Sequence, residues 1–378
     1  MTKKVGILSM HRIYNYGSFL QGYSLKKMIE ATDADVAVEF LDYRPGQVLV
    51  KETADSSSKL KRILDKLKAY NAVDAKLSDK IRFFNHKRTY GKRFFPMLGL
   101  SPEPNYNTAV DVEVIGSDEV FNAVQANTNV GYSRDLFGHD SQAKKVITYA
   151  GSFGNTTYKK IEDFGIQADL VADFSQMAAI SVRDANSKAI ITALTGETPE
   201  VNVDPVLAYD LMTLETKIPK ERLYKGQYLI AYGYSGRLTH EENEVVKAYA
   251  KKHDLKVLCF GGVQECCDLF IDCTPFELLA YFRDAAAVVT DTFHGTIFSI
   301  INQVPFATLI RKSTGLKYGN EEKLGYLLEM FDLSGQRVDE AAQIDQVLGN
   351  MINWAEVTVR LDEERLKSAN YLDNHITS

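Results

Sequence analysis

The 378-residue sequence has few cysteines: it contains four, and all lie within residues 259–273. A chain of this length without cysteine elsewhere is not built on a disulfide framework. Cys266 and Cys267 are adjacent, and no Cys-x-x-Cys pair is present to form one arm of a zinc site. We therefore expect neither disulfides nor a bound metal.

Long apolar runs are also missing. No stretch approaches the ~18 uninterrupted apolar residues of a membrane-spanning helix. The opening MTKKVGILSMHR has too short an apolar run to act as a secretory signal. The sequence therefore predicts a cytoplasmic protein.

A net charge of −6 argues against nucleic acid as a partner, but the charge is unevenly spread. Residues 59–93 carry twelve Lys or Arg against three Asp. We interpret this segment as the solvated face of one or two helices. The alternative is a patch for an anionic lipid-linked or polymeric acceptor, with peripheral contact at the inner face of the membrane.

What the sequence does contain is an alternation of short strand-like runs with segments of helical periodicity, over a length that suits two domains. The pattern begins with a βαβ unit, includes a predicted strand at VNVDPVLA and restarts at QYLIAYGYSG. It predicts an α/β protein with two Rossmann-like, doubly wound domains in a GT-B-like arrangement around an interdomain cleft. The predicted units are residues 1–208 with a basic helical insertion near 55–100, residues 209–340, and a helical segment over 341–378.

Loops that follow strands are the candidate sites, because α/β sheets bind ligands beyond the carboxyl ends of their strands. In the first domain these loops contain Asn15, Gly17 and Ser18, then Gly116, Ser117 and Asp118. Small residues and backbone N–H groups there can approach an anion closely. The alternatives are a turn and helix cap for Asn15 and Gly17, and a cap for Asp118. Because GxGxxG is absent, no dinucleotide is predicted.

In the second domain, His294 follows the run VVTD and opens a helix together with Gly295. Its imidazole should stand at the mouth of the cleft, suited to proton transfer. The alternative is a capping or packing histidine. Asp291 is predicted to be catalytic, by orienting the imidazole, or to cap the helix, and Thr292 is expected chiefly to cap it. Thr292, Gly295 and Arg311 are also predicted to bind substrate.

Cations are also expected at strand ends. Arg183 ends the strand ISVRD, where a guanidinium could hold a carboxylate or phosphate, unless it forms a surface ion pair with Asp184. Arg311 and Lys312 follow PFATLI and would add charge or lie in a solvated loop. The loop residue His11 could contact the cleft or be structural.

Read in order, seven blocks of the chain resemble the polysaccharide pyruvyl transferase family: HRIYNYGSFLQGYSL, IGSDEVFN, TYAGSFG, ISVRD, VDPVL, PFELL and VVTDTFHGTIFSIINQVPF. The resemblance implies transfer of a pyruvyl group from phosphoenolpyruvate to two hydroxyls of a sugar, as a cyclic ketal, with release of phosphate. It implies His294 as the general acid, Arg183 as a donor-binding residue and Asp118 as an aid to the acceptor hydroxyl. The acceptor would be a sugar or polysaccharide, lipid-linked or free, and no cofactor is implied.

The chain departs from the family pattern at one position. Many members carry a basic residue two positions before the histidine, where this chain has Thr292. The donor's expected cationic contact must then come from elsewhere. Two rival functions stay open: a GT-B glycosyltransferase that uses a nucleotide sugar, and a carbohydrate-binding relative without catalytic activity.

Overall fold

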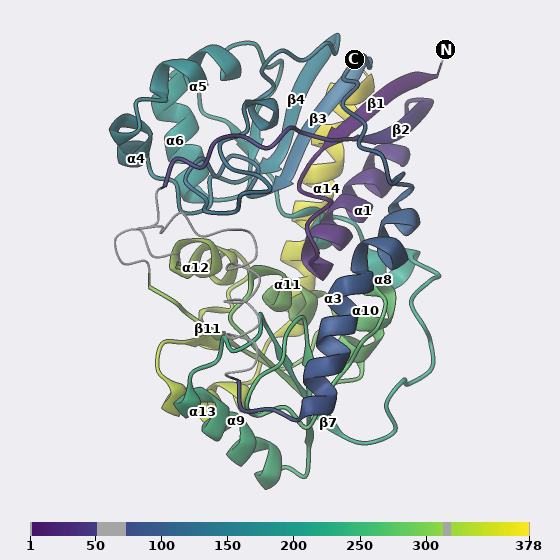
Figure 1. Cartoon of the computed structure of the whole chain (residues 1–378), viewed down its shortest axis with the longest axis vertical. Helices are drawn as coiled ribbons and strands as arrows, with labels where there is room; N and C mark the ends of the chain where they lie inside the picture. The colour runs from purple at the N-terminus through teal and green to yellow at the C-terminus, as the bar shows by residue number, and fades with distance from the viewer. Residues whose placement is uncertain (1, 51–72, 313–318, 378) are drawn as a thin grey trace.

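A computed structural model describes residues 2–50, 73–312 and 319–377. Two lobes are stacked along the long axis of the molecule (Figure 1). The upper lobe holds a parallel sheet with the order β2-β1-β3-β4-β5-β6. Its strands are β1 Lys3–Leu8, β2 Val36–Leu41, β3 Val112–Asp118, β4 Lys145–Gly151, β5 Ser181–Val182 and β6 Glu200–Val201.

The lower lobe holds a second parallel sheet, with the order β12-β11-β10-β7-β8-β9. Its strands are β7 Tyr228–Tyr232, β8 Lys256–Phe260, β9 Leu269–Phe270, β10 Ala287–Thr290, β11 Phe306–Leu309 and β12 Arg337–Val338. Every residue of β7, β10 and β11 is buried, as expected for parallel strands covered on both faces. The prediction of two doubly wound α/β sheets in a GT-B-like arrangement is confirmed.

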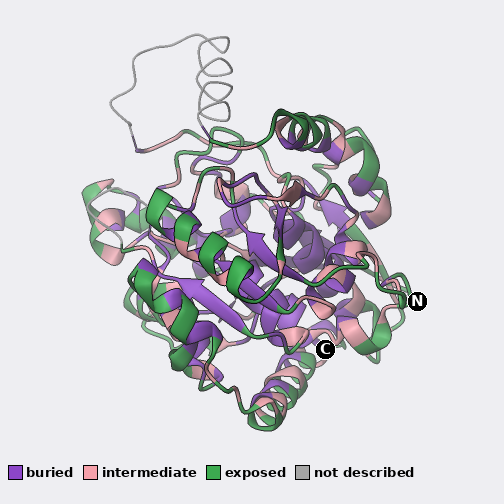
Figure 2. Ribbon diagram, turned by 90° about the horizontal axis from the view of Figure 1, so that it is seen from below, coloured by how far each residue is buried: buried purple, intermediate pink, exposed green. Residues whose placement is uncertain are grey.

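Helices surround both sheets, and their outer faces are exposed while the strands between them are buried (Figure 2). In the upper lobe these helices are α1 Tyr16–Glu30, η1 Arg134–Phe137, α4 Tyr158–Asp163, α5 Gln167–Phe174, α6 Ala185–Thr195, α7 Pro205–Ala208 and α8 Leu211–Leu214. Later helices are α9 His240–Lys252, α10 Pro275–Arg283, α11 Phe293–Ile301, α12 Glu321–Met330, η2 Ser334–Gln336, η3 Ala341–Gln343, α13 Ile344–Leu348 and α14 Trp354–Thr377. Among the described residues, no helix is long and apolar enough to cross a membrane.

The run VNVDPVLA differs from its sequence-based expectation. It was expected to form a strand, yet only Glu200–Val201 is extended, and the chain then turns into α7. The Asp-Pro pair explains the turn: the Asp204 carboxylate caps the helix by accepting from the Val206 N–H at 3.0 Å, and Pro205 occupies the first turn. Asp204 is thereby held at the carboxyl edge of the sheet.

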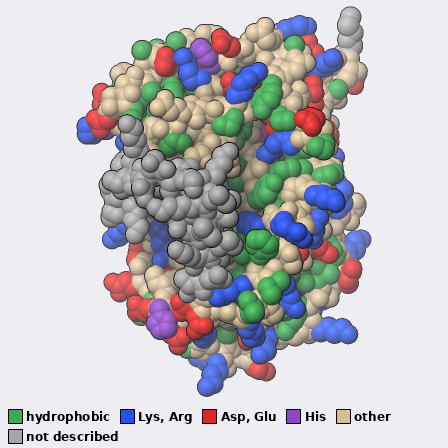
Figure 3. Space-filling view, in the orientation of Figure 1, with side chains coloured by type: hydrophobic (Ala, Val, Ile, Leu, Met, Phe, Trp, Pro, Cys, Tyr) green, Lys and Arg blue, Asp and Glu red, His purple; other side chains and the backbone are tan. Residues whose placement is uncertain are grey.

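The described part of the basic insertion is helix α3, Leu77–Leu98, and the rest of it, residues 51–72, lies outside the described residues. One face of α3 is buried and bonded to the lower lobe: Asp79 Oδ1 accepts from the Phe270 N–H at 3.1 Å, and His86 Nδ1 lies 2.7 Å from Asp272 Oδ1. The other face exposes Arg88 and Lys92, and basic side chains mix with hydrophobic ones on this side of the molecule (Figure 3). The helix is therefore solvated on one side only.

Helix α14 runs back from the lower lobe to the upper one, where the chain ends (Figure 1). The Tyr371 hydroxyl donates to the Thr148 carbonyl at 2.8 Å, and Arg365 Nε donates to the Leu207 carbonyl at 3.1 Å. Together α3 and α14 tie the two lobes together on either side of the cleft.

Candidate active site

A cavity of about 430 Å³ lies between the two sheets, within the range of small-molecule sites. Its walls come from the loops after β1 and β3 of the first sheet and after β7 and β10 of the second, with helix α3 on one side. These are the neighbouring strands at which each sheet reverses its winding direction. Open α/β sheets bind ligands at such switch points. Here two switch points face one another across the cleft.

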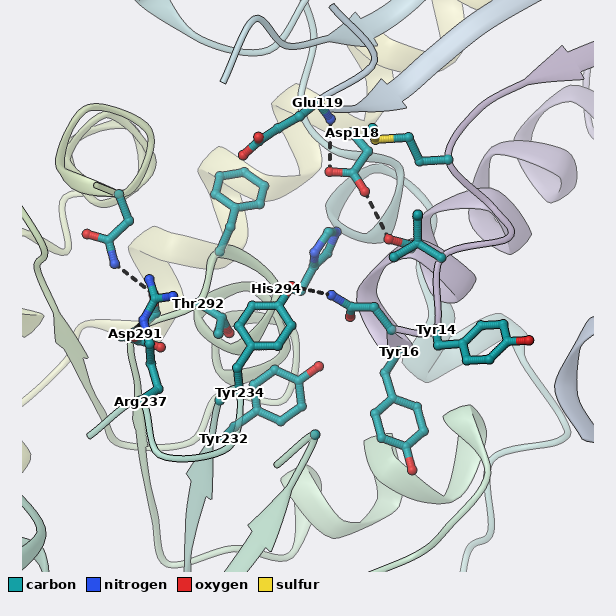
Figure 4. Close-up of a pocket in the computed structure, with 18 of the residues that line it drawn as sticks. Tyr14, Tyr16, Asp118, Glu119, Tyr232, Tyr234, Arg237, Asp291, Thr292 and His294 are labelled. Carbon is teal, nitrogen blue, oxygen red and sulfur yellow. Dashed lines mark hydrogen bonds and ion pairs between the residues drawn. The ribbon is translucent and has the colours of Figure 1, made fainter. Parts of the chain in front are cut away.

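His294 stands near the centre of this cavity, between Asp118 and Tyr234 (Figure 4). It begins α11, and the Thr292 hydroxyl caps that helix by accepting from the Gly295 N–H at 3.0 Å. The prediction that Thr292 caps the helix is confirmed. His294 is only 8% exposed, and its Nε2 lies 3.5 Å from Asp204 Oδ2. That separation is long for a hydrogen bond, and Nε2 is a buried atom that faces the Asp204 carboxylate.

Asp204 connects His294 to Arg183. Its Oδ2 accepts from Arg183 Nη1 at 2.9 Å, and the carboxylate is fully buried. Burial raises the pKa of the Asp204 carboxyl, but His294, Arg183 and the Val206 N–H outweigh burial, so the pKa is lowered. An ionised Asp204 thus joins the arginine of the upper lobe to the imidazole of the lower one.

Arg183 lines the cavity, but it does not pair with Asp184 on the surface, as the alternative interpretation had it. Asp184 caps α6 by accepting from the Ser187 N–H at 2.8 Å. The buried guanidinium instead binds Asp204, lies 3.6 Å from Asp118 and packs 4.3 Å from the centre of the Phe293 ring. Arg183 Nε has no hydrogen-bond partner among the described residues.

The loop after β1 supports the histidine directly. Asn15 caps α1 by accepting from the Gly17 N–H at 2.8 Å, and its amide donates to the Tyr234 hydroxyl across the cleft at 3.0 Å. A Cβ at Gly17 would lie 2.2 Å from His294 Nδ1, so only glycine leaves room for the imidazole. Ser18 donates to Asp118 Oδ2 at 3.0 Å. The loop therefore shapes the histidine site.

Asp118 lines the cavity, whereas Gly116 and Ser117 do not, contrary to expectation. Ser117 is buried and donates to the Ala150 carbonyl at 2.9 Å, and a Cβ at Gly116 would lie 2.1 Å from the Tyr149 carbonyl oxygen. Both are packed inside the sheet. Gly295 was also expected to bind substrate, but it lies against β10, where a Cβ would meet Thr290 Oγ1 at 2.2 Å.

Asp291 does not orient the imidazole or cap α11. Its Oδ2 accepts from Arg237 Nε at 2.6 Å and from Arg311 Nε at 3.3 Å. Arg311 also binds Glu242 at 2.8 Å and lies outside the cavity wall, so its expected role as a substrate-binding residue is wrong in this structure. Asp291 lines the cavity, and its Oδ1 is a buried atom without a hydrogen-bond partner among the described residues.

Two further candidates, Lys312 and His11, are not among the residues that line the cavity. Lys312 is exposed in its loop. His11 is buried, with Nε2 3.2 Å from Asp42 Oδ1, and is structural.

Several cavity residues were not identified from the sequence, among them Lys87 of α3, Tyr234, Arg237 and Lys323. Lys323 pairs with Glu119 of the upper lobe at 2.8 Å and closes the cleft on one side. Asp204, which lies behind the cavity wall, was not identified from the sequence either. The sequence did indicate it, because Asp204 lies in the block VDPVL, which contributes to the family resemblance.

The sequence model described as polysaccharide pyruvyl transferase matches residues 15–313. The chain belongs to the polysaccharide pyruvyl transferase family. The matched region carries His294, Asp204, Arg183 and Asp118. The family is an enzyme family, and in this pyruvyl transferase all four residues meet at or directly behind one cavity.

Solved structures resemble this chain at low sequence identity. A UDP-GlcNAc 2-epimerase from Methanocaldococcus jannaschii is 11% identical, with a TM-score of 0.46 over 100% of this chain and 99% of its own. A UDP-GlcNAc 2-epimerase from Neisseria meningitidis is 10% identical, with a TM-score of 0.46 over 100% and 98%. The glycotransferase of kitacinnamycin is 10% identical, with a TM-score of 0.45 over 100% of both chains. None of the curated proteins matches the chain.

No group of three or more His, Cys, Asp or Glu within the described ranges is arranged to hold a metal ion. The four cysteines are buried as free thiols. The cations that line the cavity are Lys87, Arg183, Arg237 and Lys323.

Proposed function

We propose that this enzyme transfers a pyruvyl group from phosphoenolpyruvate to two hydroxyls of a sugar in a polysaccharide or its lipid-linked precursor. One observation carries the proposal: His294 lines the cavity, packs against Gly17 and has its Nε2 3.5 Å from the carboxylate of the buried Asp204–Arg183 pair. An imidazole held in this way is placed to move a proton at a substrate atom. The proposed site is in the cytoplasm, where the phosphorylated donor would be available.

His294 would protonate the terminal methylene carbon of phosphoenolpyruvate, which becomes the methyl group and leaves C2 electron-poor. A first sugar hydroxyl attacks C2, and its proton passes to the cavity bases, His294 or Asp118. The C2–oxygen bond to phosphate then breaks, the second hydroxyl attacks C2, and its proton leaves with the phosphate. Two hydroxyl protons are thus accounted for by the new methyl hydrogen and the released hydrogen phosphate.

The surrounding groups support this chemistry. Asp118 and Asp291 line the cavity and would interact with the acceptor hydroxyls, and tyrosine rings line its wall. Arg183 lies at the wall with Nε unbonded, where it can attract the donor's negative charge. We propose no cofactor, because positive groups of the protein can stabilise the charge that moves in this reaction.

The first test is calorimetric and needs no knowledge of the acceptor. Wild type and His294→Asn are titrated separately with phosphoenolpyruvate and with uridine diphosphate. Both proteins are expected to bind phosphoenolpyruvate. In an acceptor screen that follows phosphate release, His294→Asn should lose about 10²–10⁴-fold in turnover, the usual worth of a general acid or base.

Binding of uridine diphosphate alone would reject the proposed donor and favour a glycosyltransferase. Sugar binding without turnover in the wild type, unchanged in His294→Asn, would favour a non-catalytic relative.

A further inference from the structure

Lys87 belongs to the inserted helix α3, yet it reaches the same cavity as His294. Its Nζ donates to the backbone carbonyl of Tyr14 at 2.7 Å, and the side chain is half-buried. Figure 4 places Tyr14 on the opposite side of the cavity from Arg237 and Asp291, with His294 between them. Lys87 therefore lies on the wall across the cavity from the Arg237–Asp291 ion pair.

The other lysines and arginines of the cavity wall are already neutralised. Arg183 has Asp204 at 2.9 Å, Arg237 has Asp291 at 2.6 Å, and Lys323 has Glu119 at 2.8 Å. Lys87 has no carboxylate within ion-pair distance anywhere in the described chain. Lys87 is thus a cation of the cavity wall without a matching carboxylate among the described residues.

The surroundings of Lys87 are otherwise neutral or already paired. The Phe83 ring lies 5.8 Å from its Nζ, and the preceding residue in the helix, His86, faces Asp272. Tyr90, one turn further, is buried. Burial lowers the pKa of Lys87 to about 8. A half-buried ammonium without a counter-ion costs folding free energy, and such groups gather at functional sites.

We propose that Lys87 binds an oxyanion of the donor, the carboxylate or the phosphate of phosphoenolpyruvate. This assignment rests on the proposed function. The ammonium uses one donor on Tyr14 and has two left for the ligand. An anion bound between Lys87 and the Arg183 side of the cavity would hold the donor next to His294.

Calorimetry on the full chain tests this with three probes: phosphoenolpyruvate, pyruvate and inorganic phosphate. Lys87→Met is compared with wild type and with Lys92→Met, a control on the exposed face of the same helix. Lys87→Met should bind phosphoenolpyruvate about 10- to 100-fold more weakly, the worth of a hydrogen bond to a charged group. Lys92→Met should bind as wild type does. Loss of pyruvate binding assigns the carboxylate to Lys87, and loss of phosphate binding assigns the phosphate.

Unchanged phosphoenolpyruvate binding in Lys87→Met would overturn the assignment while leaving the donor proposal intact. A wild type that binds none of the three probes would reject the donor, and the assignment with it.

A pH profile gives a second readout. Lys87 loses its charge as the pH rises through about 8, so wild-type affinity should fall above that pH, whereas Lys87→Arg should stay flat because guanidinium remains charged. The donor's phosphate is fully ionised throughout this range, since its second pKa is about 6. A Lys87→Arg profile identical to that of wild type would contradict the proposal, even if Lys87→Met did not fold.

Discussion

Two buried aspartates, Asp204 and Asp291, stand at the carboxyl edges of the two sheets, and each binds an arginine. Asp204 joins residues of both lobes: it binds Arg183 and faces Nε2 of His294 at 3.5 Å. Asp291 binds Arg237 and Arg311 of its own lobe. Arg311 also forms an ion pair with Glu242. The two carboxylates therefore have different roles. Asp204 positions the His294 imidazole between the lobes, whereas Asp291 balances the charge of arginines within one lobe.

Asp204→Asn should have the largest effect on turnover in this comparison. We expect turnover to fall about 100-fold, because the imidazole loses its directing charge, with little change in KM for phosphoenolpyruvate. The free energy of unfolding should fall by about 3–5 kcal/mol, since Arg183 is left buried without its main partner. Steady-state phosphate release and denaturant unfolding measure the two effects, and unchanged turnover would remove Asp204 from the mechanism.

Asp204→Asn should also change how the stability of the protein depends on pH. Because the folded-state pKa of Asp204 is lowered, its ionisation stabilises the fold above the unfolded value of about 3.9, and this stability is lost as the pH falls through the folded pKa. Wild type should therefore lose more stability than Asp204→Asn when the pH is lowered below about 4.

Gly17→Ala tests whether the position of the imidazole matters. The new methyl group would meet His294 Nδ1, so the ring must move, and turnover should fall about tenfold or more. Gly22→Ala is the matched control, because its Cβ would meet no atom closer than 3.4 Å in the same helix. Equal turnover in the two variants would show that the contact between Gly17 and His294 is unimportant.

Asp291→Asn should have the smallest effect on turnover, less than about threefold, if its role is charge balance. Its unfolding free energy should still fall by about 3 kcal/mol, because two arginines lose a shared buried partner. A large loss of turnover with unchanged stability would instead place Asp291 in catalysis, as first predicted. A rise in KM for the acceptor alone would assign Asp291 Oδ1 to a sugar hydroxyl.

The sequence predicted much of the fold, because strands and helices follow from local patterns. Apolar runs predicted the strands β1, β3, β7 and β10, and Thr292 predicted the start of α11. The strand expected at VNVDPVLA failed for an equally local reason, the Asp-Pro cap that begins α7. The site was predicted in part: His294, Asp118, Arg183 and Asn15 all line the cavity.

The sequence by itself determined that two doubly wound sheets form and that polar loops follow their strands, since these depend on residues close together in the chain. Only the tertiary structure decided that Asp204, rather than Asp291, stands beside His294, and that Lys87 reaches the cavity from an inserted helix. Positions 87, 204 and 294 are too far apart for any local pattern to relate them. Which basic side chain pairs with which carboxylate depends on the distances that the fold sets between them.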